Sequence, residues 1–113
     1  ACCTAEDAAW QRMEQQLIDA VSQAEMNRLS GEMADYIDRK LDKLEADVLL
    51  DLDEKSAKLF RAASKLWREY RLAESQFEGD LFREGSVHPL IRNRAYIRIT
   101  QQRISDLSNL NED

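Results

Sequence analysis

The stretch "KLWREYRLAESQF", from Lys65 to Phe77, decides how this chain folds, because three aromatic residues share thirteen positions with five charged ones. Apolar residues around it advance by three or four positions, as on one side of a helix; they are Leu59, Ala63, Leu66, Tyr70, Ala73 and Phe77. Phe60 and Trp67 lie beside this row and widen it. We therefore expect a helix over about residues 52–78 whose aromatic residues fill a core rather than form a catalytic patch.

The residues before this helix show the same period. In residues 4–28 one apolar stripe predicts a helix, and its members are Trp10, Met13, Leu17, Val21 and Ala24. Ser22 and Glu25 have the spacing of a capping box, so a second helix beginning there is the alternative to one continuous helix. Residues 29–31, Leu-Ser-Gly, are a candidate soft break.

Residues 32–54 predict an acidic amphipathic helix. Its apolar face consists of Met33, Ile37, Leu41, Leu44, Val48 and Leu52. The segment holds nine acidic residues against three basic ones, so its other face is strongly negative. Asp51 and Glu54 again have capping-box spacing. Either the chain kinks or restarts near Asp51, or one long helix continues.

Residues 79–88, "GDLFREGSVH", predict the main loop of the chain. Pro89 suits the first turn of a following helix that runs to about Leu107, with an inner face of Leu90, Ile97, Ile104 and Leu107. The predicted fold class is therefore all-α: a small antiparallel bundle of about four helices. We expect a single domain over residues 1–113, with a flexible N-terminus at residues 1–4.

The composition excludes several classes of function. The net charge of −6 disfavours binding to nucleic acid or to an anionic membrane surface. Residues 83–103 hold five arginines against one acidic residue, while the first 82 residues contain more acidic than basic residues. We expect most of these arginines to pair with acidic residues inside the molecule.

No constellation of catalytic residues is found. His88 is the one histidine, and Ser86 is too close to it along the chain to imply a catalytic triad. One histidine and two adjacent cysteines do not make a zinc site, and no glycine-rich phosphate loop is present. We expect no enzymatic activity, no cofactor and no metal.

Protein binding remains, and two surfaces are candidates. One is the acidic helix 32–54. The other is the loop, where a rigid bundle would present Phe82, Arg83, Ser86 and His88 to a partner. The alternative for Phe82 is a buried position, as a lid on the core.

The order of several short motifs resembles a known family. They are Gln23-Ala-Glu-Met-Asn27, Trp67-x-x-Tyr70-Arg71 with Phe77, Gly85-Ser86, and Thr100-x-x-Arg103 with Leu107. Together, over residues 22–110, they are similar to the LprI-type lysozyme-inhibitor domain of bacterial envelope proteins. The resemblance implies a small helical domain that is exported, often lipid-anchored, and that binds a protein target.

The chain departs from that family in its cysteines. Relatives commonly carry cysteines at the positions of Leu29, Ser75 and Ala95, so the family disulfides are absent here and packing must replace them. Cys2 and Cys3, next to Ala1, are either an unstructured end or the lipidation site of a mature lipoprotein. We expect Trp67, Tyr70, Arg71, Gly85, Thr100 and Arg103 to be structural, with the guanidinium of Arg71 beside the indole of Trp67.

Three hypotheses follow from these observations. The first is a periplasmic or outer-envelope protein that inhibits a lysozyme-like, peptidoglycan-degrading enzyme. The second is an immunity protein that neutralises another secreted or interbacterial toxin, which the missing cysteines favour. The third is a structural envelope module that assembles through the apolar stripe of helix 32–54.

Overall fold

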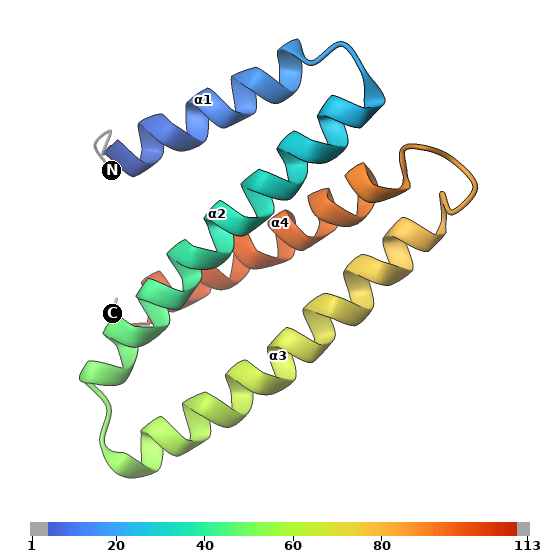
Figure 1. The fold of residues 1–113 in the computed structure, drawn as a ribbon. Helices are drawn as coiled ribbons and strands as arrows, with labels where there is room; N and C mark the ends of the chain where they lie inside the picture. The colour runs from blue at the N-terminus through green and yellow to red at the C-terminus, as the bar shows by residue number, and fades with distance from the viewer. Residues whose placement is uncertain (1–4, 111–113) are drawn as a thin grey trace.

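Four helices make up the computed structural model, which describes residues 5–110, with side chains from residue 8 onward. They are α1 (Ala5–Asp19), α2 (Gln23–Leu50), α3 (Glu54–Asp80) and α4 (His88–Ser108) (Figure 1). The predicted all-α bundle of four helices is confirmed. The flexible N-terminus that we predicted at residues 1–4, and with it Cys2 and Cys3, lies outside the described residues. None of the helices in the described part is long and apolar enough to cross a membrane.

The boundary between α1 and α2 is set by a side-chain cap. Ser22 has an extended backbone, and its Oγ accepts a hydrogen bond from the backbone N–H of Glu25 at 3.1 Å. This bond satisfies one of the free amides of the first turn. The second-helix alternative is therefore correct, and the continuous helix over residues 4–28 is wrong.

The soft break predicted at residues 29–31 is also wrong, because α2 runs straight through it. Leu29 and Ser30 are buried, and the Ser30 hydroxyl donates to the carbonyl oxygen of Asn27 at 3.0 Å. A glycine inside a helix costs roughly 0.5–1 kcal/mol, a cost that burial of its neighbours outweighs here.

The boundary between α2 and α3 is a short connection rather than a kink. Asp51 ends α2 with its N–H bonded to the Val48 carbonyl, and Asp53 begins α3. The Asp53 carboxylate accepts the N–H of Ser56 at 2.8 Å, which also lowers the pKa of that carboxyl. The predicted restart is real, but the capping residue is Asp53 and not Asp51.

The core lies where α1, α2 and α4 meet. Met33, Ala34, Ile37 and Ile97 are buried together, with Trp10, Met13, Leu17, Tyr96 and Ile104 packed around them. The rings of Trp10 and Tyr36 stack with their centroids 6.0 Å apart. Val21 and Ala24, which we expected on the same stripe as Trp10, are exposed instead, because the chain turns there.

The apolar face of α2 is buried in this core. Leu41 has no exposed surface and Met33 only 5%. The first half of the stripe of residues 32–54 is therefore not free for assembly, whereas Leu44, Val48 and Leu52 are half-buried. The third hypothesis thus lacks the continuous exposed stripe that it requires.

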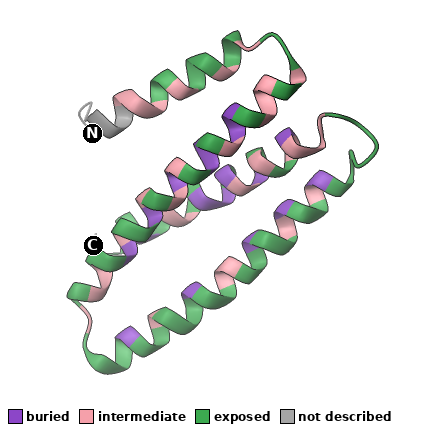
Figure 2. Cartoon of the chain, viewed as in Figure 1, coloured by how far each residue is buried: buried purple, intermediate pink, exposed green. Residues whose placement is uncertain are grey.

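Helix α3 shows the largest departure from the prediction (Figure 2). The stripe expected in the core points to solvent: Leu59, Leu66, Tyr70 and Phe77 are 55–66% exposed. The buried face instead carries Ala57, Ser64, Arg71, Ser75 and Gly79.

Close packing against α4 explains the departure. A Cβ atom on Gly79 would lie 3.0 Å from the Cβ of Arg92, so a larger residue there would push the two helices apart. Small residues along this face let the backbones approach, whereas the bulky stripe would separate them.

Candidate functional site

The loop between α3 and α4, residues 81–87, consists of consecutive tight turns. The N–H of Phe82 donates to the Gly79 carbonyl at 3.0 Å, and the N–H of Arg83 donates to the Asp80 carbonyl at 3.1 Å. The N–H of Gly85 donates to the Phe82 carbonyl at 2.9 Å. These bonds fold the loop back on the end of α3 and pair part of its backbone internally.

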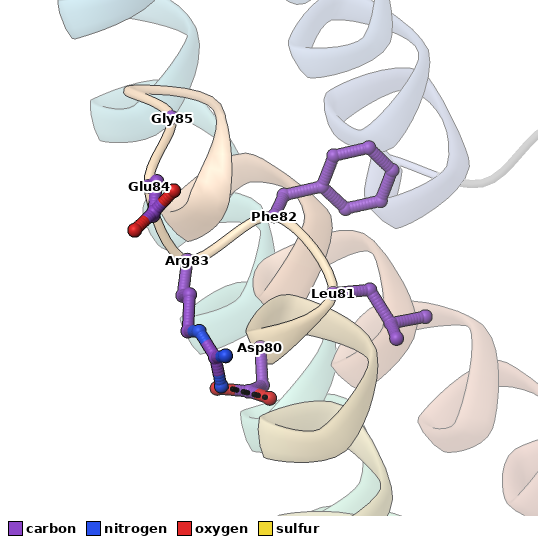
Figure 3. A pocket seen from close by; sticks show the side chains of 6 residues that line it. All are labelled: Asp80, Leu81, Phe82, Arg83, Glu84 and Gly85. Atoms are coloured by element: carbon purple, nitrogen blue, oxygen red, sulfur yellow. Dashed lines mark hydrogen bonds and ion pairs between the residues drawn. The ribbon is translucent and has the colours of Figure 1, made fainter.

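The side chains of the loop separate into an apolar and a charged side (Figure 3). Leu81 and Phe82 are 64% and 47% exposed. Arg83 forms a loose ion pair with Asp80, with Nη1 and Oδ2 3.3 Å apart. Together with Glu84 and Gly85, these residues line an open hollow of about 480 Å³. An exposed aromatic residue beside a weakly held arginine is typical of a protein-binding surface.

The loop is anchored to α2 by one amide. Asn27 Nδ2 donates to the backbone carbonyl of Ser86 at 3.1 Å, and Gln23 Nε2 donates to Asn27 Oδ1 at 2.9 Å. Two residues of the Gln23–Asn27 motif thus act as a clamp on the loop. The sequence analysis missed this role, because the spacing of two amides one helical turn apart signals only their bond to each other and not the contact with the loop.

The four loop residues predicted to bind a partner differ in how far they are exposed to solvent. Phe82, Arg83 and Ser86 are exposed together, so Phe82 does not form a lid on the core. His88 is half-buried as the first residue of α4, and its ring would lie 3.1 Å from a Cβ on Gly79. The structure thus places His88 at the base of the loop, where α3 and α4 cross.

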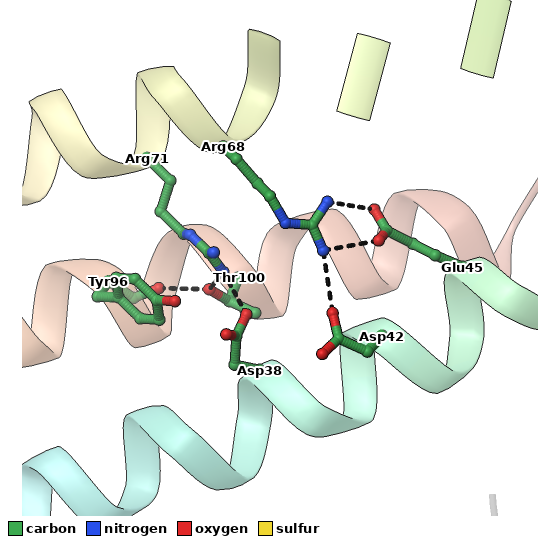
Figure 4. Close-up of polar contacts among 7 residues, drawn as sticks. All are labelled: Asp38, Asp42, Glu45, Arg68, Arg71, Tyr96 and Thr100. Atoms are coloured by element: carbon green, nitrogen blue, oxygen red, sulfur yellow. Dashed lines mark hydrogen bonds and ion pairs between the residues drawn. The ribbon is translucent and has the colours of Figure 1, made fainter. Parts of the chain in front are cut away.

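A second polar cluster lies between α2, α3 and α4 (Figure 4). The side chain of Arg71 is 7% exposed. Its Nη1 donates to Asp38 at 2.7 Å and to Thr100 Oγ1 at 3.1 Å. Its guanidinium carbon lies 4.6 Å from the ring centre of Trp67 and 4.0 Å from that of Tyr96. The stacking expected for Trp67 and Arg71 is present, and Tyr96 forms its second wall.

Arg68 adds a second bridge from α3 to α2. It donates to both carboxylate oxygens of Glu45, at 2.7 and 3.1 Å, and to Asp42 at 3.0 Å. The hydrogen bond that Arg68 donates to Glu45 is the main reason that the pKa of Arg68 is raised. Burial raises the pKa of Tyr96 to about 12. Ion pairs therefore connect α2 and α3, whose backbones both pack closely on α4.

The remaining motif residues border the same cluster. Thr100 is fully buried, and its hydroxyl donates to the carbonyl of Tyr96 at 2.7 Å. The guanidinium carbon of Arg103 lies 5.8 Å from the ring centre of Trp67 and 5.9 Å from that of Phe60. Tyr70, in contrast, is 55% exposed, and Gly85 lies in the loop.

Charge pairing differs from the expectation. Within residues 5–110, the arginines that reach the acidic face of α2 come from α3, namely Arg68 and Arg71. From residues 83–103, Arg98 pairs with Glu78 of α3 and Arg83 with the neighbouring Asp80. Two of these five arginines thus pair with acidic residues of the first 82, as expected, but within residues 5–110 Arg92, Arg94 and Arg103 form no ion pair, so the expectation that most of them pair is wrong.

The three positions at which we expected family cysteines are all interior. Leu29, Ser75 and Ala95 are 7%, 1% and 1% exposed. Each comes from a different helix among α2, α3 and α4. Two of the three carry apolar side chains, and the Ser75 hydroxyl donates to the Leu72 carbonyl at 3.1 Å.

No group of three or more residues able to hold a metal ion is found within the described part of the chain. The polar clusters there are ion pairs and helix-to-helix hydrogen bonds. The packed helices thus present one exposed loop, residues 81–87 between α3 and α4.

The comparisons with known proteins agree with this picture. Neither the curated proteins nor the solved structures include a match to the chain. The family model described as lysozyme inhibitor LprI matches residues 14–107, which is most of the chain. The chain therefore belongs to the LprI family of lysozyme inhibitors.

Proposed function

We propose that this protein binds and inhibits a lysozyme-like, peptidoglycan-degrading enzyme through the loop of residues 81–87. Membership of the inhibitor family supports the target class. The observation that carries the proposal is the exposure of Leu81 and Phe82 at the start of a loop held by backbone turns and by Asn27. A pre-ordered loop loses little conformational entropy when it binds.

The chemistry of the loop suits the cleft of such an enzyme. Glycoside hydrolases of this kind commonly carry a pair of carboxylates at the scissile bond. Arg83 is held only by the 3.3 Å contact to Asp80 and is 72% exposed, so it is free to exchange Asp80 for a carboxylate of the target. Phe82 and Leu81 would then fill the apolar part of the cleft and exclude substrate.

Charge supports the encounter. The chain has a net charge of −6, and many lysozymes are cationic. Opposite net charges accelerate association, and added salt weakens this acceleration. We place the protein in the bacterial envelope, where such enzymes act, with Cys2 or Cys3 as the candidate site of a lipid anchor.

The test is a lysis assay with the purified chain and a panel of c-type, g-type and bacterial muramidases. The parent chain should bind at least one of them and stop lysis of cell walls. The variant Phe82→Ala/Arg83→Ala should lose at least about tenfold in affinity, because about 1.4 kcal/mol is tenfold and both residues are central to the loop.

A matched control removes one exposed apolar side chain and one exposed arginine side chain elsewhere on the molecule. Ile18 and Arg39 are exposed on α1 and α2, so Ile18→Ala/Arg39→Ala should inhibit like the parent. His88 stays unchanged in both variants because it packs at the base of the loop. Equal inhibition by the parent and the loop variant would disprove the loop as the binding site.

A second candidate function, neutralisation of another secreted toxin, is favoured by the missing cysteines, since a diverged branch of the family can bind a different target. If no muramidase binds, capture of a defined toxin domain by the parent chain but not by Phe82→Ala/Arg83→Ala would favour this function.

A further inference from the structure

The outer face of α3 carries an apolar stripe that nothing in the described chain covers. Leu59, Leu66, Tyr70 and Phe77 are each more than half exposed, and Ala63 and Ala73 between them are exposed too. At about 100° per residue these six positions lie within a narrow arc of the helix. The buried face of α3, on Ser64, Arg71 and Ser75, points away from this arc and toward α4. Contiguous exposed apolar residues of this extent mark an interaction surface.

The spacing of the stripe is symmetric about residue 68. When two copies of α3 are laid antiparallel, Leu59 of one copy comes opposite Phe77 of the other, and Leu66 comes opposite Tyr70. Ala63 comes opposite Ala73, so each bulky residue meets a bulky one and each small residue a small one. A two-fold axis through the middle of α3 would make one patch complementary to itself, as an isologous dimer requires.

The charges beside the stripe favour the same arrangement. Lys55 and Lys65 lie on one flank in the first half of α3, and Glu69 and Asp80 lie on that flank in the second half. All four are exposed, and Asp80 makes only the loose contact to Arg83. Antiparallel pairing brings Lys65 near Glu69 of the second copy and Lys55 near its Asp80. Parallel pairing would put the two copies of this flank on opposite sides of the interface, so these charges would not meet one another.

We propose that α3 pairs antiparallel with α3 of a second copy of this chain, and that the stripe Leu59, Leu66, Tyr70 and Phe77 forms the centre of the dimer. Residue 81 is thirteen positions from the centre, so the two loops would project from opposite ends, about 40 Å apart at about 1.5 Å per residue. The first residue of each loop would come opposite Lys55 of the second copy, whereas residues further along the loop extend beyond the paired helices; the dimer does not rest on the proposed inhibition.

The first experiment measures mass against concentration by light scattering and sedimentation equilibrium. Cys2→Ser/Cys3→Ser is the background, so that no terminal disulfide can link two copies. The mass should rise from 13.1 kDa toward twice that value over a range of about 1 to about 500 µM. Leu66→Glu should stay monomeric, with an unchanged circular dichroism spectrum because Leu66 is 66% exposed. Ala46→Glu, on the exposed side of α2, is the matched control and should dimerise like the background.

The second experiment tests the orientation by oxidation of mixed cysteine variants. Ala63→Cys mixed with Ala73→Cys should give mainly the mixed disulfide, because these positions face each other only in the antiparallel dimer. Mainly like-with-like disulfides would indicate parallel pairing and would contradict the proposal.

Other outcomes overturn it as well. A monomer at every concentration, or a dimer that Leu66→Glu does not weaken, would show that the stripe does not pair with itself. If Leu66→Glu abolished muramidase binding by a chain that is monomeric throughout, the stripe would be a docking face for the target. Retained inhibition by a monomeric Leu66→Glu, in contrast, would separate dimer formation from the function proposed for the loop.

Discussion

Helices α2 and α3 have similar lengths and similar apolar periodicity, yet they use their apolar stripes in opposite ways. In α2 the stripe is buried, with Leu41 completely inside. In α3 the stripe with Leu66 faces solvent, and a row of small and polar residues around Arg71 faces α4. A helical period therefore shows that a face exists, but the neighbour decides whether that face is buried.

The difference has a structural cause in α4. That helix lies against both α2 and α3 and is buried on two sides, through Ile97 and Ile99 among others. Its contact with α3 is close at Gly79, where a Cβ would lie only 3.0 Å from the Cβ of Arg92 and 3.1 Å from the ring of His88. Polar residues are tolerated on this face because Arg71 meets a carboxylate, a hydroxyl and two aromatic rings.

The most direct test of the difference between the two stripes is to truncate one leucine on each of them. Leu41→Ala should lower the free energy of unfolding by about 2–5 kcal/mol, because it opens a cavity at a fully buried site. Leu66→Ala should change it by less than about 0.5 kcal/mol, since Leu66 is largely exposed already. Urea denaturation at low protein concentration measures both. Similar losses in the two variants would contradict the exposed position of the α3 stripe.

The next test concerns the polar face of α3. Arg71→Met should cost about 3 kcal/mol, because it leaves Asp38 without its cation and removes the stacking on Trp67 and Tyr96. We expect the lower end of the range for a broken buried pair, because the Asp38 side chain is 34% exposed. Thermal and urea unfolding both report the loss. The double variant Asp38→Ala/Arg71→Met should recover part of it, and a fully additive loss would show that the two residues do not act as a pair.

Smaller changes in stability, of opposite sign, are expected when the two glycines that lie inside helices are replaced by alanine. Gly79→Ala should destabilise by about 1–3 kcal/mol, because the new methyl group would meet Arg92 and His88 at about 3 Å. Gly31→Ala is the matched control: its nearest neighbour, Asn93 Nδ2, would be at an ordinary 3.7 Å, so it should stabilise by roughly 0.5–1 kcal/mol. The two melting temperatures should move in opposite directions. A rise in both would show that α3 and α4 have room to separate.

The smallest effect is a pH dependence at the outer edge of α3. The hydrogen bond from Arg98 lowers the pKa of Glu78, so the pair stabilises the fold above the ordinary carboxyl pKa and loses this contribution as Glu78 is protonated. The pKa of Glu74 is raised, mainly because its carboxyl forms a hydrogen bond with the carboxyl of Glu78.

The variant Arg98→Gln checks the sign. Parent and variant should differ in stability at about pH 7, and the difference should shrink on acidification and vanish once the pH falls below the lowered pKa of Glu78. Chemical denaturation at a series of pH values measures it. A difference that grew on acidification would mean that Glu78 is not the group responsible.

Much of the site could be predicted from the loop sequence itself. Gly85, the polar residues around it and Pro89 predicted a turn followed by a helix, and Phe82 and Arg83 are exposed there. The clamp by Asn27 could not be derived, because Asn27 and Ser86 are 59 residues apart and nothing local shows that they meet. His88 was grouped with the exposed residues for the same reason: its neighbour Gly79 belongs to the other helix of the crossing.

The sequence by itself determined the elements of this protein. Helix propensity, the cap at Ser22, and the glycine and proline of the loop act over one or two turns, so they are legible without a partner, whereas the cap of α3 was expected at Asp51 and lies two residues later at Asp53. Only the tertiary structure decided which face of α3 is buried, which arginines reach α2 and what holds the loop. These choices depend on how closely two backbones approach and on which charges they then bring together, and neither quantity exists until the helices pack.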